Sequence, residues 1–131
     1  MTLATIEAYY AAFNRGDIDG MLATLHDDFA HNVNEGETRL GKQAFVEFCR
    51  HMSATYSENL TDIVVFSGAG GTRGAAEFTV NGTYLKTDPG LPEARGQKYV
   101  LAAGGFFTLK DGKITRVTTY YNLQDWIRQV S

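Results

Sequence analysis

The spacing of apolar residues changes near the middle of the chain, and this change limits the possible fold classes. Up to about residue 58 the spacing is mostly helical, with a break at about residues 29–41. Beyond it, segments rich in β-branched and aromatic residues alternate with glycine-rich or Asp-Gly turns. The expected strands are Asp62–Ser67, Ala75–Thr87, Gln97–Lys110 and Lys113–Leu123. Helices followed by antiparallel strands predict an α+β domain with its helices on one face of the sheet.

The first 28 residues predict two amphipathic helices joined by a tight turn. Gly16 stops the first helix and Asp17 can cap the second. Tyr9 lies one turn before Phe13, beside a stripe that carries Leu3, Ile6, Tyr10 and Phe13. The second helix is expected to end at Asp27-Asp28 and to bury Ile18, Met21, Leu22 and Leu25.

An isolated strand and a third helix are expected between these helices and the sheet. Phe29–Gly36 is short and ends in glycine, which favours a strand. Gly41 then precedes a helix with Ala44, Phe45, Phe48, Met52 and Tyr56 on one side.

Composition narrows the functional classes. At 131 residues the chain is long enough for one domain, 1–131, with a single core. Its net charge of −3 gives no basic face for nucleic acid, and one cysteine, Cys49, excludes an internal disulfide. No apolar run approaches the roughly 18 residues of a membrane helix, so we expect a soluble cytoplasmic protein.

Strand parity predicts which side chains face the helices. Phe78, Val80 and Tyr84 alternate with polar residues and should point inward. One face of the next strand carries Tyr99, Leu101, Ala103, Gly105, Phe107 and Leu109. Its other face is also apolar, with Val100, Ala102 and Phe106, which predicts a homodimer through the outer sheet face.

Two features leave alternatives open. The small residues Ala102–Gly105 indicate a bulge or bend, or volume left for a ligand. The seven Tyr, eight Phe and Trp126 either fill the core or line a cavity for a flat apolar ligand. The segment Asp88–Gly96, which contains both prolines, is expected to overhang the mouth of such a cavity.

The order of elements, with the segments Tyr9–Asp17, Asp27–Phe29 and Asp111–Val117, resembles the nuclear transport factor 2-like superfamily. That group includes ketosteroid isomerase, SnoaL-like polyketide cyclases and limonene epoxide hydrolase. The chain is most similar to the ketosteroid isomerase-related proteins, at His31–Gly36, Gly82–Asp88 and Tyr120–Trp126. The resemblance implies a cone-shaped, curled antiparallel or mixed sheet that wraps a long N-terminal helix around an internal pocket.

The isomerase uses a carboxylate base, a tyrosine that stabilises the enolate, and a carboxylic acid kept neutral by its apolar site. The resemblance places the tyrosine on Tyr9, the base at Val33, or at a neighbour if the register shifts, and the acid at Gly105. Valine cannot accept a proton and glycine cannot donate one. Steroid isomerase activity is therefore not expected.

Other residues are candidates for the chemistry. His31 is in phase with Val33 on a strand and can serve as general base, or it is a structural histidine satisfied by backbone, Asp27 or Asp28. Tyr9 is an enolate-stabilising donor or a buried phenol bonded to a carbonyl. The expected ligand-binding residues are Val33, Phe78, Val80, Tyr84, Tyr99, Ala103, Gly105, Phe107, Thr119 and Tyr121.

Three functions follow from this set. The first is an enzyme, isomerase- or cyclase-like, that moves a proton on a small, largely apolar carbonyl compound without a cofactor. The second is a non-catalytic module for hydrophobic-ligand binding or dimerisation. The third is a protein-docking domain, which needs an apolar patch outside the dimer interface.

Three scattered histidines and one cysteine give no metal-site spacing.

Overall fold

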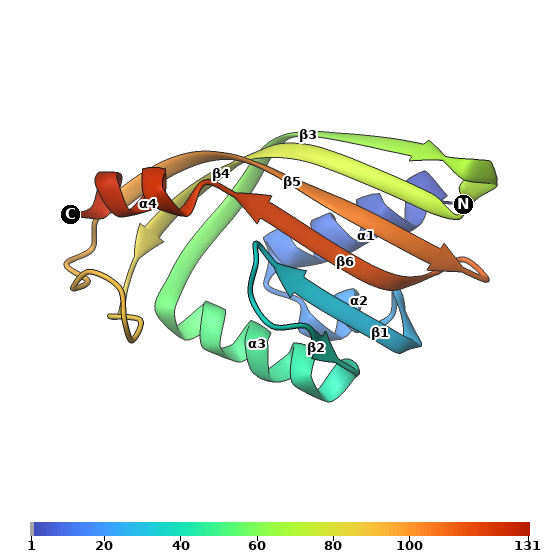
Figure 1. Ribbon diagram of the computed structural model, residues 1–131, viewed down its shortest axis with the longest axis horizontal. Helices are drawn as coiled ribbons and strands as arrows, with labels where there is room; N and C mark the ends of the chain where they lie inside the picture. The colour runs from blue at the N-terminus through green and yellow to red at the C-terminus, as the bar shows by residue number, and fades with distance from the viewer. Residues whose placement is uncertain (1) are drawn as a thin grey trace.

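A computed structural model describes residues 2–131 (Figure 1). Its helices are α1 (Thr2–Arg15), α2 (Ile18–Leu22), α3 (Lys42–Thr55), the short 3₁₀ helix η1 (Ala69–Gly71) and α4 (Leu123–Val130). Its strands are β1 (Leu25–Val33), β2 (Arg39–Leu40), β3 (Tyr56–Gly68), β4 (Arg73–Tyr84), β5 (Lys98–Lys110) and β6 (Lys113–Tyr121). No helix in this described part is long and apolar enough to cross a membrane.

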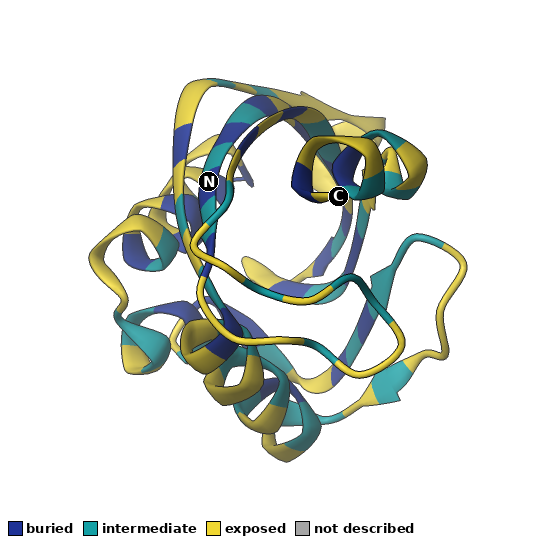
Figure 2. Cartoon of the chain, turned by 90° about the vertical axis from the view of Figure 1, so that its left-hand side faces the viewer, coloured by how far each residue is buried: buried dark blue, intermediate teal, exposed yellow. Residues whose placement is uncertain are grey.

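The strands form one six-stranded mixed sheet in the order β2-β1-β6-β5-β4-β3. The β1–β6 pair is parallel and the other pairs are antiparallel. Seen end-on, the sheet curls around on itself (Figure 2). Helix α1 contacts β3, β4 and β6, and α3 contacts β1, β2 and β3. The predicted α+β fold, with a curled mixed sheet around an N-terminal helix, is confirmed.

Helix α1 buries one aromatic side against the sheet. Tyr9 and Tyr10 each lie edge-on to Phe107, with ring centroids 5.8 Å apart, and Tyr10 also packs on Phe78 at 5.0 Å. The predicted cap is present, since Asp17 Oδ1 accepts a hydrogen bond of 2.8 Å from the Gly20 amide. Leu3 was expected inward, but it is 43% exposed because the buried stripe runs through Ile6 and Tyr10 instead.

The second helix is shorter than its sequence predicts. It ends at Leu22, and Leu25, Asp27 and Asp28 belong to β1. Leu25 aligns with Ile114 and His31 with Val117 in the parallel ladder with β6. These long-range hydrogen bonds override the local helical spacing. The strand predicted as isolated is therefore part of the main sheet.

Strand β3 begins at Tyr56, six residues earlier than expected, so the prediction of helix to about residue 58 is wrong. Tyr56 aligns with Tyr84 and Leu60 with Val80, which extends the antiparallel pairing of β3 with β4. The polar residues between Tyr56 and Leu60 hid this strand, because they give little apolar alternation.

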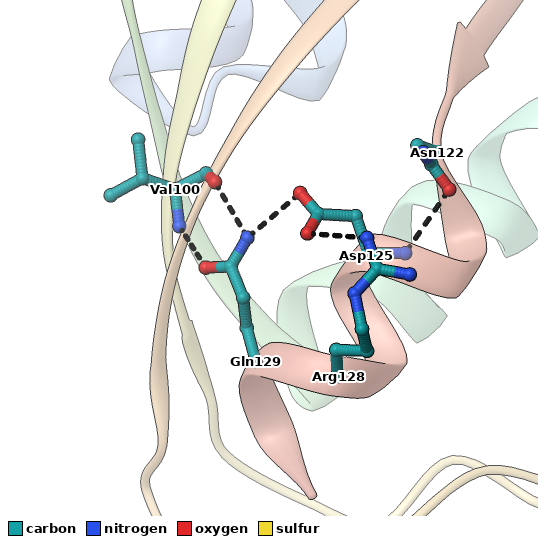
Figure 3. Close-up of polar contacts among 5 residues, drawn as sticks. All are labelled: Val100, Asn122, Asp125, Arg128 and Gln129. Carbon is teal, nitrogen blue, oxygen red and sulfur yellow. Dashed lines mark hydrogen bonds and ion pairs between the residues drawn. The ribbon is translucent and has the colours of Figure 1, made fainter.

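Helix α4 (Leu123–Val130), near the C-terminus, was not predicted from the sequence. Asn122 caps α4 by accepting from the Asp125 amide at 3.1 Å (Figure 3). The side-chain amide of Gln129 accepts from the Val100 N–H through Oε1 and donates from Nε2 to the Val100 C=O, each at 2.9 Å (Figure 3). This part of β5 lies beyond the pairing with β6, so Gln129 satisfies an exposed sheet edge.

The small residues at Ala102–Gly105 do not form a bulge. The pairing of β5 is regular there, and its irregularity lies between Thr108 and Leu109. The volume above Gly105 is taken by Tyr10, whose hydroxyl oxygen lies 2.6 Å from the position of an added Cβ.

A second glycine permits a contact that crosses three strands. Glu58, Gly82 and Tyr99 align side by side on β3, β4 and β5. A Cβ at Gly82 would lie 2.2 Å from the Tyr99 ring, so the ring passes directly over this glycine. It then reaches Glu58, and its hydroxyl donates a hydrogen bond of 2.5 Å to Oε2.

Replacing Gly82 with alanine should therefore destabilise the fold. Tyr99 is 2% exposed and cannot move aside freely, so we expect a loss of about 1–3 kcal/mol in urea unfolding. Gly68→Ala is the control, because an added Cβ there meets nothing within 4 Å. Equal stability of the two variants would contradict the crossing contact.

Candidate functional site

A cavity of about 890 Å³ lies between α1, α3, α4 and the concave face of the sheet. This volume falls in the upper part of the range of small-molecule sites. Most of its lining is apolar or aromatic, with contributions from Met21, Phe45, Phe48, Leu101 and Trp126 among others.

The cavity brings together most of the residues named from the sequence. The lining includes Tyr9, His31, Val33, Phe78, Val80, Ala103, Thr119 and Tyr121. The other four are buried but do not line the cavity: Tyr84, Tyr99, Gly105 and Phe107. Of these, Tyr84 donates to the Pro92 carbonyl at 2.7 Å, and Phe107 packs against Tyr9 and Tyr10.

His31 is held in an aromatic pocket on β1. Its ring lies 5.1 Å from Phe45, 4.6 Å from Phe48 and 6.2 Å from Phe29 between centroids. The buried Nδ1 has no hydrogen-bond partner within residues 2–131. Burial, and to a lesser extent the Arg39 charge, lowers the pKa of His31 to about 4. The imidazole is therefore neutral at pH 7.

The expected structural partners of His31 lie elsewhere. Asp27 pairs with Lys42 at 3.3 Å on the surface, and its side chain is 95% exposed. Neither Asp27 nor Asp28 bonds His31 among the described residues.

Two phenols of α1 face the sheet. Burial raises the pKa of both Tyr9 and Tyr10, with Tyr10 and Cys49 adding to the effect at Tyr9. Both phenols therefore stay protonated and can donate hydrogen bonds. The Tyr10 hydroxyl is buried without a partner in the described chain, over the backbone of Gly105.

Glu58 places a carboxyl group on the cavity wall. Tyr99 donates to Oε2, while Oε1 makes no hydrogen bond with any described residue. Burial raises the pKa of Glu58, and the Tyr99 hydrogen bond opposes this in part. The group is thus a carboxylate with increased proton affinity and one free oxygen.

A further polar cluster joins α3, β3 and the 88–96 loop. Asp88 Oδ1 lies 3.0 Å from His51 Nε2, and Oδ2 accepts from the Tyr56 hydroxyl at 2.6 Å. Asp88 and Leu91 both line the cavity, so the loop contributes to its wall. Cys49 also lines it, but burial raises its pKa to about 11, which keeps the thiol protonated.

Arg39 on β2 is the remaining charged group of note in the lining. Its guanidinium carbon lies 4.5 Å above the Phe48 ring. Its Nη1 is buried without a hydrogen-bond partner in residues 2–131.

Sequence reasoning missed Glu58, Arg39 and the role of Tyr10. Glu58 has inward parity with Tyr56 and Leu60, a signal that appears only once β3 is known to begin at residue 56. Arg39 pairs with His31 across the β1–β2 ladder, and a two-residue strand leaves no periodic signal. The described residues contain no cluster of three or more His, Cys, Asp or Glu able to hold a metal ion.

Comparison with known families agrees with this architecture. The model of the SnoaL-like domain matches residues 6–117. The chain belongs to the SnoaL-like domain family, within the nuclear transport factor 2-like superfamily. The resemblance inferred from the sequence is thereby confirmed. Among curated proteins, none matches the chain.

Several solved structures are similar. A candidate polyketide cyclase from Silicibacter sp. TM1040 is 64% identical, with TM-score 0.97 over 99% of this chain and 95% of that one. A second, from Pseudomonas putida KT2440, is 53% identical, with TM-score 0.97 over 100% and 98%. An epoxide hydrolase from Mycobacterium tuberculosis shares the fold at 20% identity, with TM-score 0.72 over 98% and 88%.

The buried neutral His31 predicts a pH-dependent stability. Its pKa is about 4 in the folded chain against an ordinary 6.5, so the unfolded chain binds the proton first as pH falls. We expect a loss of about 3 kcal/mol between pH 6.5 and 4, measured by urea unfolding. His31→Phe should remove this part of the dependence. His26→Gln, which changes a partly exposed histidine, should keep it, and identical profiles for His31→Phe and wild type would contradict the assignment.

Proposed function

We propose that this protein binds a small, largely apolar carbonyl compound in the cavity and moves a proton on it, as an isomerase or cyclase would. The apolar lining fits the body of such a ligand, and the phenols and titratable groups fit its carbonyl and the adjacent C–H bond. The naming of relatives at 53% and 64% identity as candidate polyketide cyclases supports this class of reaction.

The observation that carries the proposal is the free oxygen of Glu58. A general base must face the substrate and must have a proton affinity suited to its task. Glu58 meets the first condition through its place in the lining and the second through burial. It supplies a carboxylate to the cavity, whereas the resemblance places Val33 and Gly105 at the positions of the isomerase carboxyl groups.

Tyr9 keeps the role predicted from the sequence. We assign the base to Glu58 in preference to His31, because a pKa of about 4 makes the imidazole a weaker base than a free histidine. Tyr9 is the enolate-stabilising donor, and Tyr10 over Gly105 is a second phenol on the same helix. Developing negative charge in an apolar site is stabilised strongly by such donors.

The alternative is a non-catalytic ligand-binding module. It is favoured by Val33 and Gly105, which cannot exchange a proton through their side chains. In that case the polar groups orient a ligand and do no chemistry.

Deuterium exchange separates the two functions. With 2-tetralone in D₂O, the wild-type protein should accelerate exchange at the carbon beside the carbonyl. Glu58→Gln keeps an acceptor for Tyr99 but cannot take a proton, so the rate should fall about 10²–10⁴-fold. The wild-type rate should also fall on the acid side, at a pH above the ordinary glutamate range, because Glu58 must be ionised.

Glu77→Gln is the matched control, since Glu77 lies exposed on the outer face of β4. An unchanged rate in Glu58→Gln would remove Glu58 from the mechanism. Binding of a panel of aromatic ketones without any exchange would favour the non-catalytic alternative.

The homodimer remains part of the proposal. The outer sheet face exposes Val64, Phe66, Val100, Phe106 and Tyr120 by 45%, 50%, 58%, 50% and 49%. Phe106 and Tyr120 form a ring pair 5.9 Å apart on adjacent strands. Contiguous exposed apolar side chains of this size are typical of an interface.

Light scattering after gel filtration should therefore give the mass of a dimer. Phe106→Glu places a charge within the apolar face and should shift the protein toward the monomer. Leu40→Glu changes another exposed residue, on β2, and should leave the dimer intact. A monomeric wild-type protein at micromolar concentration would contradict the proposal.

A further inference from the structure

The guanidinium of Arg39 lines an apolar cavity without an acidic partner. No carboxylate lies within 4.0 Å of it in the described chain. Contact with the Phe48 ring covers one face of the group, and Nη1 is buried without a hydrogen bond. A buried charged donor left unpaired is costly, so a ligand acceptor would recover free energy there.

The other charged groups of the lining already have partners. Arg15 pairs with Asp17 at 3.1 Å. Glu58 accepts from Tyr99, and Asp88 contacts His51 and Tyr56. No other charged group of the lining can therefore turn to Arg39 without breaking an existing contact.

A second unpartnered group lies beside Arg39. Arg39 and His31 are aligned neighbours in the β1–β2 ladder, and both side chains contact the Phe48 ring. His31 is 3% exposed, and its Nδ1 also lacks a partner in the described residues. Arg39 Nη1 and His31 Nδ1 are therefore two polar groups in this part of the cavity that a ligand could satisfy.

Charge differs between the two ends of the cavity. Arg39 lies on β2, beside the N-terminal half of α3, whereas Glu58 lies on β3, which starts where α3 ends (Figure 1). A ligand carboxylate would be repelled from Glu58 and Asp88 and attracted to Arg39. The distribution of charge favours one orientation of an acidic ligand.

We propose that the ligand is an apolar carboxylic acid whose carboxylate accepts hydrogen bonds from Arg39 and from Nδ1–H of the neutral His31, in the β1–β2 part of the cavity. This inference rests on the proposed ligand-binding function and names its substrate class: a keto acid or related acidic carbonyl compound. The planar guanidinium fork matches a carboxylate, and the aromatic lining of α3 and β1 holds the attached apolar body. The carbonyl of such a ligand then extends toward Glu58.

The test compares two ligands of one shape by titration calorimetry at pH 7.5: 2-naphthoate and 2-naphthamide. The wild-type protein should bind the acid at least tenfold more tightly than the amide. Arg39→Gln should abolish this preference while retaining amide binding, and Arg39→Lys should retain part of it because the charge remains. Arg50→Gln, which changes an exposed arginine of α3 outside the cavity lining, should leave the preference unchanged.

The amide and the acid report on different claims. Binding of the amide with no preference for the acid would overturn this inference and leave the cavity proposal intact, whereas binding of neither compound would overturn both. A preference that survives in Arg39→Gln would also overturn it. Acetate added in excess should not displace 2-naphthoate, because acetate lacks the apolar body. Displacement would overturn the inference, since the site would then bind any carboxylate. Circular dichroism of each variant checks that its fold is retained.

Discussion

The packing of the Tyr9 and Tyr10 rings against Phe107 and Phe78 holds α1 on the concave side of the sheet, and the cavity depends on it. Helix α1 has 14 residues and is about 21 Å long, whereas β3 and β5, with 13 residues each, are about 43 Å long, so the helix covers only part of the concave face. The remaining space is enclosed by α3, α4 and the 88–96 loop, which meet around Tyr56, Asp88 and Trp126. Aromatic side chains can frame a cavity because they are large and rigid.

Within this frame, burial does most of the chemical tuning. It lowers the pKa of His31 and raises the pKa of Glu58, so that one group stays neutral while the other gains proton affinity. Arg39 borders the same apolar cavity and has no acidic partner among residues 2–131. The three groups come from β1, β3 and β2, and α3 lies against all three strands. A single helix therefore fixes how the titratable groups face one another.

The sequence predicted the parts of this site that lie on regular, strongly patterned elements. Tyr9 and His31 were found because α1 has clear helical spacing and the 31–33 strand has clear parity. Glu58 could not be assigned, because β3 begins with polar residues that give no clear alternation. Leu25 shows the reverse error, since its helical spacing was overridden by parallel pairing with β6. Pairing with distant strands determines the conformation at these positions, and such pairing gives no periodic pattern in the local sequence.

Tyr10 lies against residue 105, where the resemblance to ketosteroid isomerase places the neutral acid. A Cβ at residue 105 would lie 2.6 Å from the Tyr10 hydroxyl oxygen, so an acid there requires the phenol of Tyr10 to move. Glycine at 105 leaves room for the phenol of Tyr10, which is a hydrogen-bond donor at this place. The proposed proton transfer then needs a base other than residue 33, because valine cannot accept a proton. Glu58 lines the cavity with its carboxylate. The Tyr99 ring passes over Gly82 and its hydroxyl donates to Oε2, which leaves Oε1 free.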